Sequence, residues 1–524
     1  MVFPLSLSAQ VNRYFVSFKD KNNSPYSVSN PSQFLSQKSI DRRTREGFAT
    51  IEEDLPVNAT YIQQVKAVGA KVFFSSRWFN GVLVQTDTSI IKSVNSLSFV
   101  SKVELVADSA LLLSGRKSAQ KKTEQVSKAN ALQNQSQLQM IGLDQLHDAG
   151  YHGEGIDIAV FDDGFIGVDT ISGFKRLYQE GRLKEVFSFV YNNVDSAYAI
   201  DKHGTSTLSI LAGNIPDKYF GGAYMANFFL YQTEDYLTEY RVEEYNWLFA
   251  AERADSAGID VISSSLGYST FDDATMDYTY ANLNGNTAVI SIAAHKAFLR
   301  GISVVNAAGN DGGDSWKYID VPADAVGVIA VGAVDATGVK ALFSSLGPTS
   351  DGRIKPDVSA LGVSSVVFSS SGCCYVGDGT SFACPLVAGL VADLRQMNPQ
   401  FSAQEIYNQV ISMGTQYAHP DNFLGYGIPI FRLTDVIVQQ EEIQIFPNPV
   451  KDGQLKILLN GFVGEELNVQ LYNSYGQKVF EGLISINTEN DSYTINMLHY
   501  ASGMYYVSIR TSNSVKIAKV INVK

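Results

Sequence analysis

Hydrophobic and polar positions follow three successive patterns along this chain, and each pattern predicts a different architecture. From about residue 12 to residue 107, short apolar runs are mixed with stretches of helical spacing. The apolar runs lie at residues 14–18, 71–74 and 81–84, and the helical stretches near 57–68 and 88–97. This mixture predicts a small α+β domain.

The second pattern extends from Gly153 to about Ile437, where apolar strand-like runs alternate with helical stretches. Such alternation is typical of βαβ units built around a parallel sheet, so the predicted fold class is α/β. The clearest strands are at residues 156–161, 261–263, 304–307 and 328–331. Their polar or glycine-containing ends mark the carboxyl edge of the sheet, where open α/β folds place their sites. A helix over residues 242–257 is expected to end before Gly258.

The third pattern follows residue 441 and consists of short alternating strands at residues 467–472, 478–480 and 504–509. It predicts a small β-sandwich with a turn at 473–476 and with no polar cluster that suggests chemistry.

The segments between these patterns complete the predicted domain order. Residues 114–137 are rich in lysine and glutamine and have little to bury, which predicts an exposed linker open to cleavage. Residues 1–11 are short and apolar without a basic start, so we interpret them as the remnant of a clipped secretory signal; a frayed terminus is the alternative. The α+β domain then covers 12–113, the α/β domain 138–437 and the β module 438–524.

Composition excludes some classes of protein. A chain of 524 residues is too long for one compact domain, and 45% hydrophobic residues are typical of a globular protein. The net charge of −13 argues against nucleic acid as the main partner, and no apolar run is long enough to cross a membrane as a helix.

The three cysteines, Cys373, Cys374 and Cys384, allow at most one disulfide within the chain. Neighbouring cysteines rarely bond to each other, so the hypothesis is a bridge from Cys384 to one of the other two.

One serine has the setting of a nucleophile. Ser381 follows Gly379 and precedes an apolar helix, so it is expected at a helix N-terminus, where backbone N–H groups and the helix dipole favour negative charge. Pro385 is expected in the first helical turn, where no intrahelical bond is lost. Taken alone, a serine in this setting is more often a capping residue before a core helix than a nucleophile.

A serine nucleophile needs an imidazole to take its proton and a carboxylate to orient the imidazole. Of six histidines, His203 opens an apolar helix, whereas His295 lies inside a helix and is expected at the surface. Asp162 directly follows the strand at 156–161, with Asp163 as the competing carboxylate and a turn as the alternative role.

Together these pieces resemble the subtilisin-like serine proteases, the subtilases. Residues 162–164 are similar to the family's Asp-Thr/Ser-Gly motif, residues 203–205 match its His-Gly-Thr, and residues 379–385 match its Gly-Thr-Ser-x-Ala-x-Pro. The chain order Asp, His, Ser is also that of subtilisin. The resemblance covers about residues 135–437.

The resemblance implies a secreted serine endopeptidase that acts on polypeptides. Ser381 would be the nucleophile, His203 the general base and then acid, and Asp162 the orienting carboxylate. Asn310, which ends an Ala-Ala-Gly-Asn run, would donate to the oxyanion. No cofactor is required for this chemistry. Structural calcium is common in subtilases, but no local run of ligands is evident in the sequence.

Substrate-binding residues are also implied by the resemblance. Ser265, Leu266 and Gly267 match an edge that pairs with extended substrate, although a plain sheet edge is the alternative. Leu266, Ala307 and Gly309 would line the pocket for the residue before the cut.

Three residues depart from the family pattern. Asp163 replaces Thr or Ser, Cys384 replaces Ser, and Asp378 stands where Asn is common. The two aspartates are expected to raise the pKa of the catalytic histidine and to favour basic substrates. A pH–rate profile with an acid limb at or below the value of a free histidine would contradict this expectation.

The flanking domains fit the same resemblance. The α+β domain looks like a subtilase propeptide, which assists folding and inhibits the enzyme within the same chain. Residues 447–449 (Pro-Asn-Pro), with Tyr472-x-x-x-Gly476 and Gly503-x-Tyr505 after them, resemble the type IX secretion sorting domain. This domain implies a partner in the outer-membrane secretion machinery, export across a Gram-negative outer membrane, and then release or surface attachment.

Two other functions remain open from the sequence. A catalytically silent, exported surface protein could keep the same fold as a binding scaffold. An α/β-hydrolase esterase is disfavoured because Ser381 lacks the Gly-x-Ser-x-Gly elbow and the order of the three residues differs.

Overall fold

A computed structural model describes residues 11–108, 126–128, 134–433, 442–460, 462, 466–486, 491–510 and 515–524. The chain divides into two compact units, Met1–Phe431 and Arg432–Lys524. All of the predicted signal remnant except Val11, and most of the predicted linker, lie outside the described residues. No helix in the described part of the chain is long and apolar enough to span a membrane.

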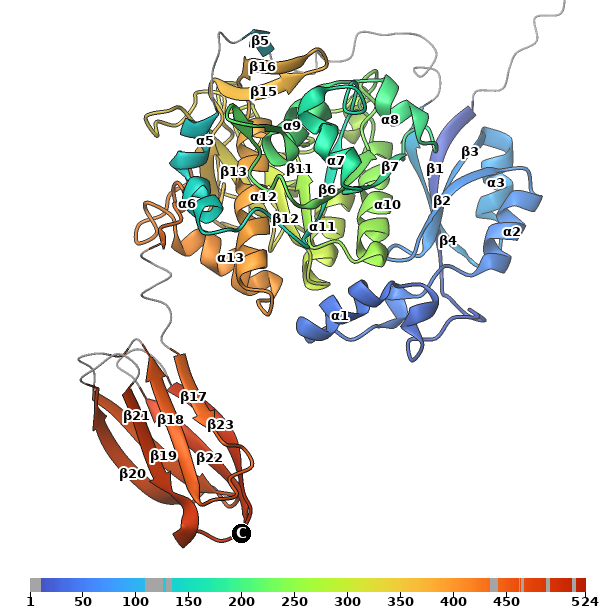
Figure 1. Cartoon of the computed structure of the whole chain (residues 1–524). Helices are drawn as coiled ribbons and strands as arrows, with labels where there is room; N and C mark the ends of the chain where they lie inside the picture. The colour runs from blue at the N-terminus through green and yellow to red at the C-terminus, as the bar shows by residue number, and fades with distance from the viewer. Residues whose placement is uncertain are drawn as a thin grey trace, which may run out of the picture. The chain divides into compact units, whose positions relative to one another are not determined.

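The centre of the first unit is a seven-stranded sheet in which every pair of neighbours is parallel, as the alternating pattern predicted (Figure 1). Its order from one edge to the other is β14 (Val358–Leu361), β13 (Ile329–Val334), β12 (Ser303–Ala307), β11 (Val261–Ser264), β6 (Asp157–Asp162), β10 (Asn227–Gln232) and β7 (Leu183–Ser188). The four strands predicted from the sequence are thus β6, β11, β12 and β13. All four are almost entirely buried, because helices cover both faces of a parallel sheet.

Two pairs of helices cover this sheet. On one side, α12 (Thr380–Met397) lies against β11, β12 and β13 and also contacts α9 (His203–Ala212). On the other, α10 (Val242–Ala257) packs against α11 (Val289–Leu299) in a shared hydrophobic core. The predicted end of α10 is confirmed, since Gly258 takes a left-handed conformation with φ of 92° that closes the helix.

The N-terminal domain is a four-stranded antiparallel sheet with the order β2 (Lys71–Ser76), β3 (Gly81–Asp87), β1 (Val11–Phe18) and β4 (Val100–Ala107). Helices α2 (Ala59–Ala67) and α3 (Thr88–Asn95) were both predicted. The sequence pattern missed β4 and also α1 (Gln37–Arg45). Helix α1 escaped detection because its buried face carries Ser39, Arg42 and Arg43 rather than apolar residues.

A buried cluster of charges joins the N-terminal domain to α10. Arg42 and Arg43 of α1 and Arg77 of the β2–β3 turn all donate to the carboxylate of Asp255, at 2.5 to 2.6 Å. Burial alone would raise the pKa of Asp255, but the arginines outweigh it and hold that pKa below its ordinary value. Beside them, the carboxylate of Glu252 accepts the backbone N–H of Arg77 at 2.9 Å. The N-terminal domain is therefore fixed by ion pairs that exclude water.

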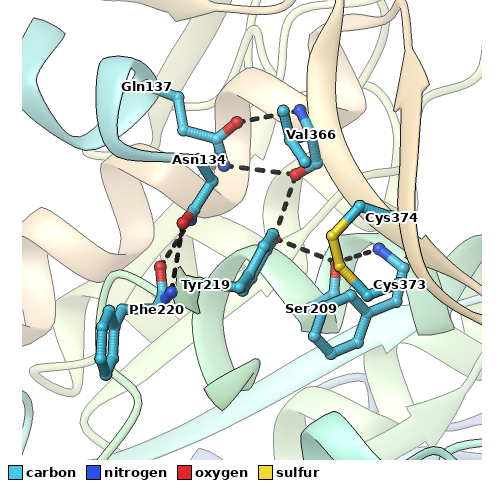
Figure 2. The surroundings of a disulfide bond; sticks show 9 residues. Asn134, Gln137, Ser209, Tyr219, Phe220, Val366, Cys373 and Cys374 are labelled. Carbon is cyan, nitrogen blue, oxygen red and sulfur yellow. Dashed lines mark hydrogen bonds between the residues drawn. A yellow bond between two sulfur atoms is a disulfide. The ribbon is translucent and has the colours of Figure 1, made fainter. Parts of the chain in front are cut away.

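Residues close to the predicted linker belong to the first unit. Helix α5 (Gln135–Met140) begins within the last residues of that stretch and buries Gln137. The Gln137 amide exchanges two hydrogen bonds with the backbone of Val366, and the Tyr219 hydroxyl donates to the same carbonyl (Figure 2). This end of the predicted linker is thus held by buried polar contacts.

The second unit is a β-sandwich, as predicted. One sheet has the order β17 (Glu442–Phe446), β18 (Gln454–Asn460) and β21 (Asp491–Asn496); the other has the order β20 (Lys478–Ser485), β19 (Glu466–Asn473), β22 (Gly503–Arg510) and β23 (Val515–Asn522). Alternate residues of β18, β19 and β22 point into one hydrophobic core. The predicted turn closes with a hydrogen bond from the Gly476 N–H to the Asn473 carbonyl, at 3.0 Å.

Replacing Asp255 with Asn should destabilise the full chain strongly. The substitution keeps the shape but leaves three buried guanidinium groups without their shared charge, and breaking a buried ion pair costs about 3–5 kcal/mol. Urea unfolding of the purified chain measures this loss. The stabilisation by Asp255 should also fade as the pH falls below the ordinary carboxyl range, because its folded-state pKa is lowered.

Asp41→Asn is the matched control. Asp41 lies on the same helix but is exposed, and its carboxylate accepts one hydrogen bond from Gln37. The unfolding midpoint of this variant should match that of the parent chain. Equal midpoints for Asp255→Asn and Asp41→Asn would refute the structural role of the arginine cluster.

Candidate active site

The carboxylate of Asp162 accepts three hydrogen bonds at the carboxyl edge of the sheet. Asp162 ends β6 and is 0% exposed. Its Oδ1 lies 2.6 Å from Nδ1 of His203, and its Oδ2 accepts the hydroxyl of Thr207 at 2.9 Å. The backbone N–H of Asp163 also donates to Oδ1, at 2.9 Å. The three hydrogen bonds fix the position of this carboxylate, which in turn fixes the orientation of the imidazole.

His203 is the first residue of α9, and its side chain is 21% exposed. Its backbone N–H donates to the carboxylate of Asp201 at 3.1 Å, which fixes the start of the helix. The next residue, Gly204, has no room for a side chain. A Cβ at this position would lie 2.4 Å from the Gly164 carbonyl oxygen and 2.9 Å from the Asp162 Cβ. The close approach of α9 to the end of β6 places the His203 imidazole within hydrogen-bonding distance of the Asp162 carboxylate.

Ser381 lies in the first turn of α12, as expected, and is 5% exposed. The expectation for Pro385 was wrong. Pro385 lies beyond the first turn, so it removes the N–H that would have bonded to the carbonyl of Ser381. The hydroxyl of Ser265 donates to that carbonyl instead, at 2.9 Å. A residue next to β11 thereby anchors the turn that carries Ser381.

The amide of Asn310 has a defined orientation. Its Oδ1 accepts both the backbone N–H of Thr380, at 2.9 Å, and the Thr380 hydroxyl, at 3.0 Å. Gly309 donates its own N–H to the same hydroxyl at 3.3 Å. With Oδ1 bound to Thr380, the NH₂ end of the Asn310 amide is directed away from Thr380.

These side chains meet in one cleft of about 550 Å³. Its walls contain His203, Ser381 and Asn310 together. The residues expected to bind substrate also line it, namely Ser265, Leu266, Gly267, Ala307 and Gly309. Asp162 lies behind His203 and does not belong to the lining. The cleft therefore brings together residues that lie up to about two hundred positions apart in the sequence.

The two aspartates that depart from the family pattern have different positions. Asp163 lines the cleft, whereas Asp378 is exposed and accepts the backbone N–H of Ser364 at 2.6 Å. Ser364 has a φ of 54°, so Asp378 supports a left-handed turn.

Carboxylates that the sequence analysis did not single out also line the cleft. They are Asp201, Glu234, Glu239, Asp311, Asp314 and Asp320. No local motif marks these residues, because they come from separate loops that only the folded chain assembles.

Two groups of described residues place three potential metal ligands within 4.8 Å of one another. The first, Asp162, Asp163 and His203, contains the Asp–His pair already described. The second consists of Glu234 and Glu239, which precede α10, and Glu243 in its first turn. The hydroxyl of Tyr268 donates a hydrogen bond to Glu234. Glu234 therefore also has a structural contact in the wall of the cleft.

The hypothesis of a bridge to Cys384 was wrong. Cys373 and Cys374 are joined to each other in β16 (Gly372–Gly377), near Ser209 and Tyr219 (Figure 2). Cys384 is a free, fully buried thiol whose Sγ lies 3.5 Å from the carbonyl oxygens of Ser264 and Val305. Its side chain packs between α12 and the strands β11 and β12. A disulfide to Cys373 or Cys374 would require the side chain to leave this position.

The fold and the cleft together define a class of protein. A parallel α/β domain that presents an Asp–His pair and a serine at a helix start, around one cleft, has the arrangement of a serine hydrolase. The chain belongs to the subtilase family, whose pattern matches residues 153–427, just over half of the sequence. Residues 13–127 match the peptidase S8 propeptide domain of Bacteroidota, and residues 444–524 match a secretion system C-terminal sorting domain.

Individual relatives agree with this assignment. The chain is 29% identical over 286 residues to subtilisin NAT of Bacillus subtilis subsp. natto, a match that covers 54% of this chain and 66% of that protein. It is 30% identical over 276 residues to subtilisin-like protease SBT6.1 of Arabidopsis thaliana, which covers 51% and 24%. Subtilisin DY of Bacillus licheniformis is 38% identical over 165 residues, 31% of this chain and 53% of that protein. The match thus spans no more than about two thirds of each of these relatives.

Alkylation should distinguish the three cysteines. Burial raises the pKa of Cys384 to about 12, so its thiol stays protonated and unreactive in the folded chain up to strongly alkaline pH. Intact mass after iodoacetamide, without reductant, should show no addition at pH 8 and one addition in denaturant. Three additions in denaturant would contradict the disulfide, and one addition to the folded chain would contradict the burial of Cys384.

Proposed function

We propose that this protein is a secreted serine endopeptidase made as a zymogen. The observation that carries the proposal is the 2.6 Å contact between Asp162 and His203 at the edge of a cleft that Ser381 and Asn310 also line. A chain that had kept the subtilase fold only as a scaffold would have no need for this buried, fully bonded carboxylate.

The chemistry would begin with His203. With Nδ1 bound to the Asp162 carboxylate, the neutral imidazole carries its proton on Nδ1 and presents Nε2 as a base. Nε2 takes the proton of the Ser381 hydroxyl while Oγ bonds to the carbonyl carbon of the peptide. The Asp162 carboxylate stabilises the resulting imidazolium by its negative charge.

The negative oxygen of the tetrahedral intermediate would be bound by two donors. One is the backbone N–H of Ser381 at the positive end of α12, and the other is the Asn310 amide, whose NH₂ end is oriented by Thr380. His203 then gives its proton to the departing amine, the C–N bond breaks, and an acyl-enzyme on Ser381 remains. Water, deprotonated by His203, releases the acid and restores the serine.

The flanking domains would control when and where this activity exists. The N-terminal domain, held by the ion pairs at Asp255, would assist folding and inhibit the enzyme within the chain until it is cut away. The C-terminal module would direct export through the type IX machinery across the outer membrane, with release or attachment at the cell surface.

Labelling by a fluorophosphonate probe tests the nucleophile. The matured protein should react with one equivalent of the probe, and the mass shift should map to the peptide that contains Ser381. Ser381→Ala should abolish labelling and also prevent the chain from processing itself. Ser371→Ala is the control, because Ser371 is an exposed serine outside the cleft. If the matured wild type resists labelling, the protein is a silent scaffold and the proposal is wrong.

Asp162→Asn tests the role of the carboxylate. The amide can keep the packing but favours the wrong tautomer of His203, so kcat should fall by about 10⁴-fold at neutral pH with little change in KM. Peptidase assays with a chromogenic peptide measure both constants. A loss below about tenfold would show that Asp162 is not needed to orient the histidine.

A further inference from the structure

Asp320 lies where the side chain of the bound substrate must go, and we propose that it selects substrates that are cut after Arg or Lys. This inference rests on the proposed peptidase function and adds the chemical class of its substrate. Asp320 belongs to no motif in the sequence and comes from the loop between β12 and β13.

The position of the substrate side chain follows from the reacting groups. The scissile carbonyl carbon must lie at Ser381 Oγ with its oxygen toward the Asn310 amide. The residue before the cut supplies this carbonyl, so its side chain leaves the backbone next to Asn310. Gly309, which precedes Asn310, and Gly267 line the cleft there.

Asp320 forms the floor of this pocket. A Cβ on Gly309 would lie 2.3 Å from Asp320 Oδ2, and a Cβ on Gly267 would lie 2.8 Å from the Asp320 Cβ. Both positions must therefore be glycine for the Asp320 side chain to fit between them. The backbone of Asp320 is fixed as well, because its N–H donates to the Ala308 carbonyl at 3.1 Å.

The burial of this carboxylate decides which side chain it accepts. Asp320 is 6% exposed, yet it lines the cleft. An apolar substrate side chain would seal a negative charge away from water, which is unfavourable. A guanidinium or ammonium group would instead pair with the carboxylate, and its methylene stem could pack along Trp316, which lines the same cleft.

The remaining walls have the same sign of charge. Six further carboxylates line the cleft, from Asp163, Asp201, Glu234, Glu239, Asp311 and Asp314. Lys202 is the one lysine or arginine among the described residues of the lining. A cleft of one sign concentrates the field and attracts ligands of the opposite sign, so cationic peptides should bind fastest.

Matched peptide substrates test the proposal with the matured protein. Two fluorogenic peptides that differ only in Arg or Leu before the cut should differ in kcat/KM by at least about 100-fold in favour of Arg. Asp320→Asn should reduce this ratio by about 100-fold, because cleavage after Arg becomes slower and cleavage after Leu faster. Asp169→Asn, an exposed carboxylate outside the cleft lining, should leave the ratio unchanged.

Two readouts separate this proposal from the one on which it rests. Fluorophosphonate labelling of each variant reports the nucleophile and the fold independently of the pocket. Normal labelling with no preference for Arg, or a preference that survives Asp320→Asn, would overturn the assignment of Asp320 and leave the peptidase function intact. An absence of labelling in the wild type would overturn both.

Discussion

The geometry of the site depends on one buried negative charge, the carboxylate of Asp162. It is removed from water at the end of β6 and is compensated by hydrogen bonds from His203, from the Thr207 hydroxyl and from the Asp163 N–H. A carboxylate in this position would be costly without such partners, so the fold must bring α9 against β6 before the charge can be buried. The same requirement orients the imidazole, which couples the stability of this corner of the protein to its chemistry.

The serine side of the cleft is anchored by a different kind of contact. Pro385 leaves the carbonyl of Ser381 without its helical partner, and the Ser265 hydroxyl supplies the missing hydrogen bond. Thr380 at the same turn fixes the Asn310 amide. Ser381, Asn310 and Ser265 are therefore linked through one helical turn, so a displacement of α12 would disturb all three.

Charge plays two separate roles in this protein. At Asp255, buried arginines neutralise the carboxylate and attach the N-terminal domain to α10. In the cleft, seven carboxylates face a single lysine among the described residues of the lining, and their combined field favours a cationic ligand. The acidic composition of the chain at first argued only against nucleic acid as a partner. The positions of the carboxylates in the cleft add a physical reason to propose a cationic substrate.

The parts of the structure that depend on short-range order can be predicted from the sequence. Its periodicity predicted the parallel sheet, the C-terminal sandwich and the end of α10 at Gly258, and the local contexts of Asp162, His203 and Ser381 indicated the site. The tertiary structure alone decided that Cys373 bonds to Cys374, that Ser265 serves the carbonyl freed by Pro385, and that Asp320 lies under Gly309. Helix α1 was missed for the same reason, since its buried face is made of arginines whose partner is on α10. Periodicity and capping act between residues a few positions apart and leave a trace in the sequence. Contacts between distant segments leave none, because any loop of suitable length could have brought a different residue to the same place.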